Sequence, residues 1–135
     1  MSRLWHGAIA LISGVALVVQ FVLLIDRDGS VVNFFSYFTI ESNILVLIAS
    51  VLILRKADRG GTAFGILRLA GLVGITITGI IFSTVLAGAV ELNGIDWWTD
   101  KAFHYVVPAM AVIGFVFMTP RTRLDKTALW FVAWA

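Results

Sequence analysis

Three long stretches without a charged side chain limit what this chain can fold into. They cover residues 7–25, 69–90 and 102–119, and a fourth stretch, 31–54, is interrupted only by Glu41. A helix needs roughly 20 apolar residues to cross the ~30 Å hydrocarbon core of a membrane, and each stretch is close to that length. A transmembrane β-barrel would show alternating segments of about ten residues, which the sequence lacks. The pattern therefore predicts an all-α integral membrane protein.

We expect one transmembrane helical domain over residues 1–135, because no repeat, low-complexity tract or linker divides the chain. The four complete spans are predicted at about 7–25, 34–54, 66–90 and 100–119. A last apolar segment, 127–135, would reach only about 14 Å as a helix. We interpret this segment as a truncated fifth helix, in preference to a segment that lies at the membrane interface.

The charged residues are few and unevenly placed. They make up 13% of the chain, against roughly 25% in soluble domains. Of the ten Lys and Arg residues, all but Arg27 and Lys101 lie near the N-terminus or around 55–68 and 121–126. Basic residues gather in cytoplasmic loops, so we place the N-terminus in the cytoplasm of a multi-pass cell-membrane protein that contacts membrane lipids. No basic stripe with interleaved aromatic residues is present, which argues against a nucleic-acid partner.

The second span begins with SYFTIESNIL, residues 36–45, which is unusually polar for a membrane helix. On a helix that starts near Asn33, four polar residues share one face: Ser36, Thr39, Ser42 and Asn43. Glu41 lies about 160° from Thr39 and points elsewhere. The polar face can bridge neighbouring helices, or it can form the wall of a reactive or ligand-binding cavity. Glu41 can be neutral inside the bundle, reach water, or carry protons or ions in a transporter.

His104, in the fourth span, is the second unusual feature. Asp100 precedes it by one helical turn, so its carboxylate can accept the imidazole N–H and fix one tautomer. Pro108 follows by one turn and lacks the N–H that would normally bond to the carbonyl of His104. We therefore expect a local irregularity here. A single histidine in a membrane helix is either a satisfied packing residue or a functional one.

The predicted topology connects Thr39 with His104. Both spans run in the same direction, and both residues lie roughly 8–12 Å below the outer ends of their helices. A bundle can therefore bring the hydroxyl and the imidazole to hydrogen-bond distance, with His104 as a general base and Thr39 as a nucleophile. Spacing alone does not distinguish this arrangement from a structural bridge between helices.

The sequence gives no indication of a metal or cofactor. It contains no cysteine, and its carboxylates are too scattered to join one buried histidine as a ligand set. The segment GLVGITITG, residues 71–79, is not a phosphate-binding loop, and its small residues favour close helix packing.

Three segments resemble the small bacterial membrane proteins related to the androgen-induced protein and the androgen-dependent regulator of tissue-factor-pathway inhibitor. These are SYFTIESNIL at 36–45, DKAFHYVVP at 100–108 and ILRLAGLVGITITGIIF at 66–82. The resemblance spans nearly the whole chain. Two features differ: relatives often carry glutamine where Glu41 stands, and a Tyr-His pair near Phe82-Ser83 is absent here.

The resemblance implies a function. Animal members hydrolyse fatty acid esters of hydroxy fatty acids with a membrane threonine and a histidine, which correspond to Thr39 and His104. It implies a lipid or fatty acyl ester as substrate and a bacterial plasma membrane as location. Asp100 would then orient His104, and Asn43 or Ser36 would donate to the oxyanion. The alternative is a non-enzymatic membrane protein, either a scaffold or a binder or carrier of lipids or small molecules.

Overall fold

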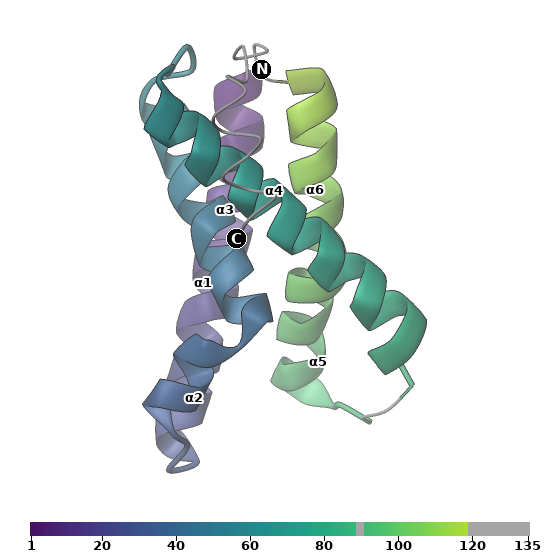
Figure 1. Cartoon of the computed structure of the whole chain (residues 1–135). Helices are drawn as coiled ribbons and strands as arrows, with labels where there is room; N and C mark the ends of the chain where they lie inside the picture. The colour runs from purple at the N-terminus through teal and green to yellow at the C-terminus, as the bar shows by residue number, and fades with distance from the viewer. Residues whose placement is uncertain (89–90, 119–135) are drawn as a thin grey trace.

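The computed structural model describes residues 1–88 and 91–118, and nearly all of them are helical (Figure 1). In chain order the elements are α1 (Ser2–Asp26), α2 (Val31–Ser36), α3 (Phe38–Arg55), α4 (Thr62–Ile81), η1 (Phe82–Leu86), α5 (Gly94–Lys101), η2 (Ala102–Val106), α6 (Val107–Ile113) and η3 (Gly114–Met118). The three η elements are π-helical turns that continue α4, α5 and α6 without a break.

The described part of the chain confirms the all-α bundle. Four helices are long and apolar enough to cross a membrane: Ser2–Asp26, Phe38–Arg55, Thr62–Leu86 and Gly94–Met118. Three of the spans begin earlier than predicted, since α1 starts at Ser2, α4 at Thr62 and the fourth span at Gly94. The predicted fifth helix, 127–135, lies outside the described residues.

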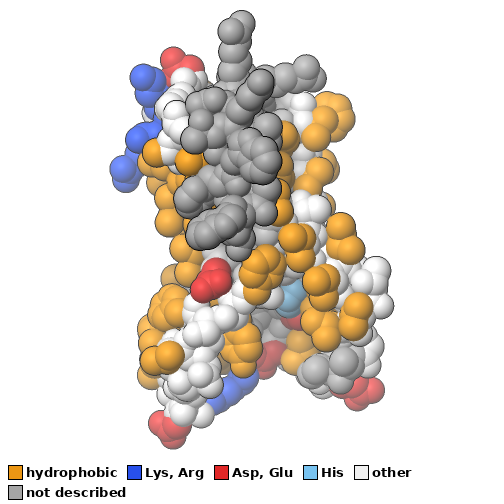
Figure 2. Space-filling view, viewed as in Figure 1, with side chains coloured by type: hydrophobic (Ala, Val, Ile, Leu, Met, Phe, Trp, Pro, Cys, Tyr) orange, Lys and Arg blue, Asp and Glu red, His pale blue; other side chains and the backbone are white. Residues whose placement is uncertain are grey.

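The bundle is organised around α3, which packs against α1 on one side and α4 on the other. Figure 1 shows α4 crossing diagonally over α3 toward the continuous α5–η2–α6 helix. The central core cluster combines residues from all four spans: Ile9, Val46, Ile75, Val107 and Ala111. Hydrophobic side chains also cover much of the outer surface (Figure 2). That surface suits contact with lipid, because acyl chains are as apolar as the side chains.

The two ends of the bundle differ in charge. At one end, which we call the basic end, Arg3 donates a hydrogen bond to the carbonyl of Arg55 at 3.1 Å. This contact brings the N-terminus beside the α3–α4 connection (Figure 1). At the opposite end, Arg27 after α1 pairs with Asp96 in α5. The gathering of basic residues at one end agrees with the uneven charge pattern of the sequence.

The second span is broken at Tyr37, which corrects the prediction of one helix from about 34 to 54. Tyr37 has an extended backbone (φ −74°, ψ 124°) that ends α2 and begins α3. The helix begins before Asn33, because Ser30 caps α2 by accepting the N–H of Asn33 at 3.3 Å. The prediction that Ser36 and Thr39 share one helical face is therefore wrong, since the two residues belong to different helices.

The region around Pro108 is irregular, as its missing N–H predicts. The chain forms the π-helical turn η2 just before it, where the N–H of Val107 bonds to the carbonyl of Ala102, five residues back. Pro108 then lies in the first turn of α6, where a missing N–H costs least. The extra residue in this turn is how the helix accommodates a proline four residues after His104. Such π-bulges are frequent at functional sites.

Close packing between α3 and α4 gives a first testable prediction. A Cβ added at Gly71 would meet Leu45 Cβ at 3.2 Å and the backbone nitrogen of Val46 at 3.3 Å. The backbone of α3 cannot yield as a flexible side chain would, so Gly71→Ala is expected to destabilise the bundle by about 1–3 kcal/mol. Unfolding in mixed SDS and non-ionic detergent micelles, followed by circular dichroism, measures the change.

Gly65, in the same helix, is the matched control. A Cβ there would meet nothing within 4 Å, so Gly65→Ala is expected to be neutral or to stabilise the helix by up to about 1 kcal/mol. Equal unfolding midpoints for the two variants would contradict close contact at Gly71.

Candidate active site

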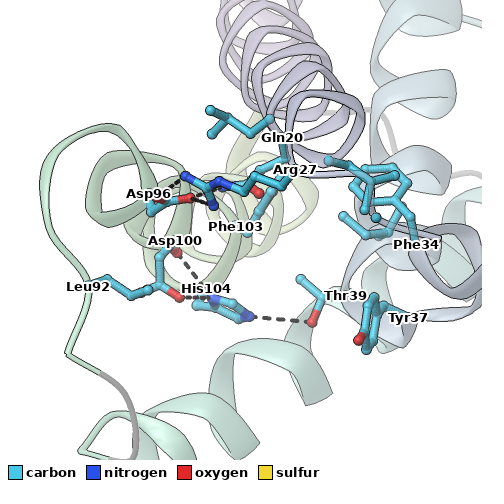
Figure 3. Close-up of a pocket in the computed structure, with 14 residues that line it drawn as sticks. Gln20, Arg27, Phe34, Tyr37, Thr39, Leu92, Asp96, Asp100, Phe103 and His104 are labelled. Carbon is cyan, nitrogen blue, oxygen red and sulfur yellow. Dashed lines mark hydrogen bonds and ion pairs between the residues drawn. The ribbon is translucent and has the colours of Figure 1, made fainter. Parts of the chain in front are cut away.

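A cavity of about 540 Å³ lies between α1, the α2–α3 break and α5, toward the end opposite the basic one. Its walls are mainly apolar, with Phe34, Ile40 and Phe103 among them. The polar side chains that line it are Gln20, Arg27, Tyr37, Thr39, Asp96, Asp100 and His104. Figure 3 shows this arrangement, in which Thr39 and His104 approach each other from two different helices.

Thr39 and His104 are hydrogen-bonded across the cavity wall. Thr39 Oγ1 lies 3.3 Å from His104 Nε2, although the residues are separated by 65 positions in the chain (Figure 3). The two helices therefore bring the hydroxyl and the imidazole together at matching depth, as the topology predicts. This distance suits proton transfer from a hydroxyl to a general base.

Asp100 determines which nitrogen of His104 carries the proton. His104 Nδ1 lies 3.1 Å from the backbone carbonyl of Asp100 and 3.0 Å from its carboxyl Oδ1. A carbonyl oxygen can only accept a hydrogen bond, so Nδ1 must be the protonated nitrogen. Nε2 then presents its lone pair to Thr39, whose hydroxyl donates to it. The orienting role expected for Asp100 thus has a geometric basis in both its backbone and its side chain.

An aromatic ring fixes the plane of the imidazole. Phe82 stacks on His104 with ring centroids 3.8 Å apart and an angle of 11° between the planes. The side chains of His104 and Asp100 are only 14% and 11% exposed. Lys101 Nζ lies 3.6 Å from the Asp100 carboxylate and also over the ring of Tyr105. These contacts hold the histidine in a single orientation.

Thr39 lies in the first turn of α3 because of the break at Tyr37. The first N–H groups of a helix have no partner within it, and the helix dipole makes this end partly positive. The carbonyl of Tyr37 accepts the N–H groups of Ile40 and Glu41. Within the part of the chain that the structure describes, the N–H groups of Phe38 and Thr39 have no acceptor. Two free donors therefore lie beside the Thr39 hydroxyl.

The other predicted site residues have different surroundings. Asn43 is fully buried and its amide Nδ2 donates to the carbonyl of Thr39 at 2.8 Å. Ser36 is exposed on α2, and its hydroxyl donates to the carbonyl of Val32. Neither residue lines the cavity, where the sequence placed one of them as an oxyanion donor. Glu41 is exposed on α3 and does not line this cavity.

Ser42 and Thr78 show the bridging role that polar residues play between membrane helices. Their hydroxyls lie 3.0 Å apart, and both side chains are buried. Ser42 also donates within its own helix, to the carbonyl of Phe38. The predicted polar face of the second span is thus divided: Ser42 joins α3 to α4, Asn43 bonds within α3, and Thr39 faces the cavity.

Sequence reasoning missed the residues at the mouth of the cavity. Arg27 makes a two-pronged ion pair with Asp96, at 2.8 and 3.1 Å. The hydrogen bond to Asp96 raises the pKa of Arg27 above its ordinary value. Gln20 donates to Thr99 and to Asp96. The signal was available in the sequence. Gln20 is an amide inside an otherwise apolar span, and Arg27 and Asp96 are opposite charges, one just after the first span and one at the start of the fourth.

Among residues 1–88 and 91–118, no group of His, Cys, Asp or Glu side chains is placed to hold a metal ion. Comparisons of the chain with protein-family models, curated proteins and solved structures find no match. What the site can do is therefore inferred from its own geometry and chemistry.

Proposed function

We propose that this protein is a membrane-embedded hydrolase of lipid (fatty acyl) esters, with Thr39 as nucleophile and His104 as general base. The observation that supports this function is the line from Asp100 through His104 to Thr39 at the wall of an apolar cavity. The resemblance of 36–45 and 100–108 to the androgen-induced protein family points to the same two residues. We therefore also propose membership of that family and a place in a bacterial plasma membrane.

The proposed reaction follows the usual two-step mechanism of hydrolases with an activated hydroxyl nucleophile. Thr39 Oγ1 attacks the ester carbonyl carbon while His104 Nε2 takes its proton. The tetrahedral intermediate collapses, the bond to the alcohol oxygen breaks, and His104 returns the proton to that oxygen. Water then gives a proton to Nε2 and attacks the acyl-threonine, which releases the fatty acid and regenerates Thr39.

The negative charge of the intermediate needs donors, and the start of α3 can supply them. The unpaired N–H groups of Phe38 and Thr39 lie at the positive end of the helix dipole. Fixed backbone donors in a site with little water are an effective oxyanion hole. They take the role that the sequence suggested for Asn43 or Ser36.

The surroundings favour a substrate with a long apolar part. The cavity walls are mostly aliphatic and aromatic, and His104 also lines a second, more open groove beside Tyr105 and Pro108. Exposed apolar side chains line the second groove: Ile80, Tyr105, Val112 and Ile113. A fatty acyl ester can therefore enter from the membrane and place its carbonyl at Thr39.

A fluorophosphonate probe, which phosphonylates activated hydroxyls, tests the proposal. We expect the folded protein to be labelled and mass spectrometry to locate the adduct on Thr39. Thr39→Ala and His104→Ala should abolish labelling, whereas Thr39→Ser should retain it because the hydroxyl remains. Ser36→Ala is the matched control, since its hydroxyl bonds within α2 outside the cavity. Absence of labelling in the folded protein, or labelling that survives Thr39→Ala, would disprove the proposal that Thr39 is the nucleophile of a hydrolase.

The rival proposal is a scaffold or lipid binder in which Thr39 and His104 only join α3 to the fourth span. The 3.3 Å hydrogen bond between them is compatible with that role. Under this alternative the Thr39→Ala variant loses stability but no chemical reactivity, so the same probe distinguishes the two.

A further inference from the structure

A second polar site lies near the basic end of the bundle, away from Thr39 and His104. It is a cavity of about 30 Å³, and three of the side chains around it are polar and buried: His6, Ser50 and Arg68. The remaining walls are apolar: Ile9, Val46, Ala49, Ile53, Leu72, Ala111 and Phe115. The proposed hydrolase gives these polar residues no role.

Arg68 is the unusual residue of this site. Its guanidinium is always charged, and the residue is only 8% exposed inside a membrane-spanning helix. It stacks over the ring of Phe115, with Cζ 4.6 Å from the ring centre. Within 1–88 and 91–118, no carboxylate lines the cavity or pairs with Arg68. Among these residues the charge of Arg68 is buried without a counter-charge, which is strongly unfavourable in a membrane protein, so a bound anion would stabilise it.

The neighbouring side chains can donate hydrogen bonds to such a partner. His6 Nδ1 lies 3.4 Å from Ser50 Oγ. When His6 donates in this pair, the hydroxyl hydrogen of Ser50 is free to point into the cavity. Arg68 then contributes charge and N–H groups, and Ser50 contributes an O–H. Among the described lining residues Ser50 offers one side-chain oxygen, too few for a cation site, and the charge of Arg68 favours an anion.

The size of the cavity limits the ligand. A volume of about 30 Å³ exceeds the roughly 10–15 Å³ needed for one water molecule. It is too small for an organic anion or a lipid head group. The apolar walls strengthen electrostatic attraction inside the cavity. Arg68 also lies only about 9 Å along α4 from its first residue, Thr62, so the site is close to water at the basic end.

We propose that this cavity binds a chloride-sized halide ion, held by Arg68 and Ser50 with His6 as the residue that orients Ser50. The bound ion would neutralise Arg68 and join α1, α3 and α4, which supply the three polar residues. The site does not depend on the hydrolase activity.

Thermal unfolding of the full chain in non-ionic detergent tests the site. Sodium gluconate is replaced stepwise by sodium chloride or sodium bromide at constant ionic strength, and tryptophan fluorescence gives the midpoint. A ligand that binds the native state raises the midpoint with a saturable dependence on its concentration. We expect chloride and bromide to raise it and sulfate, which is too large, to have no effect. Equal midpoints in gluconate, chloride and bromide would overturn the proposal and indicate a water molecule instead.

Two variants and one control locate the ion. Arg68→Gln is expected to abolish the halide effect, and Arg55→Gln, which removes an exposed charge at the same end, is expected to retain it. If Arg68→Gln does not fold, Ser50→Ala provides the test. We expect it to weaken the apparent chloride affinity about tenfold, the loss of one hydrogen bond to a charged group. An unchanged halide response in Arg68→Gln, or an unchanged affinity in Ser50→Ala, would contradict the site.

Discussion

Replacing His104 with Gln is expected to lower ester hydrolysis by about 10²–10⁴-fold, the usual contribution of a general base. Glutamine can keep a hydrogen bond to Thr39 and has a similar reach, but its amide cannot take a proton from the hydroxyl. The measurement is kcat for medium-chain p-nitrophenyl esters in detergent micelles. The loss should appear in kcat, because the base acts in the transition state and the cavity that binds the acyl chain is unchanged.

Asp100→Asn is the informative comparison for His104→Gln. The backbone carbonyl of Asp100 also accepts the His104 Nδ1–H, at 3.1 Å, and this contact survives the substitution. The productive tautomer of His104 is therefore retained in part, and we expect kcat to fall only about tenfold. The loss is far larger in a triad in which the acid's side chain alone fixes the tautomer of the histidine. A variant His104→Gln with wild-type kcat would remove the base from the mechanism.

The two outcomes separate catalysis from packing. His104 stacks on Phe82 and lies next to Gly79, where an added Cβ would come within 3.4 Å of the His104 carbonyl. If His104 had only a structural role, its replacement would lower the stability of the protein, and activity would fall only as far as the folded fraction fell. Unfolding midpoints measured on the same preparations show which of the two occurs.

The sequence predicted the four spans because long uncharged runs leave few alternatives in a membrane. It also allowed Thr39 and His104 to meet, since the predicted directions of the two helices put both residues at matching depth, and the family resemblance pointed to the same pair. The break at Tyr37 was not predictable, because neither proline nor glycine marks it. That break moved Ser36 out of the site and placed Thr39 at a helix start. Phe82 was also missed, because its stacking on His104 depends on the crossing of α4 over the fourth span.

The break at Tyr37 is central to the proposed chemistry. On the continuous helix that the sequence suggested, the N–H groups of Phe38 and Thr39 would bond to the preceding turn. In the structure they begin a new helix, and Asn43 secures its first turn by donating to the Thr39 carbonyl. Nucleophile and oxyanion donors then belong to the same rigid turn. Such preorganised donors stabilise developing charge without reorganisation during the reaction.

Phe38→Pro is expected to lower kcat about 100-fold while the protein stays folded. Proline removes the N–H of Phe38, and loss of one oxyanion donor typically costs roughly 10²–10³-fold. The substitution suits the backbone, because Phe38 is the first residue of α3, where proline is favoured. Tyr37 before it already has the extended conformation that a residue preceding proline adopts.

Phe38→Ala is the matched control, because it also removes the ring but keeps the N–H. The Phe38 side chain is 51% exposed, so its loss alone should change kcat little. Kinetics of both variants with the same p-nitrophenyl ester, together with their unfolding midpoints, isolate the contribution of the N–H group. If the two variants have equal kcat, the start of α3 does not bind the oxyanion, and donors elsewhere in the cavity must do so. If Phe38→Pro alone is impaired and both are folded, the backbone break at Tyr37 is part of the catalytic machinery.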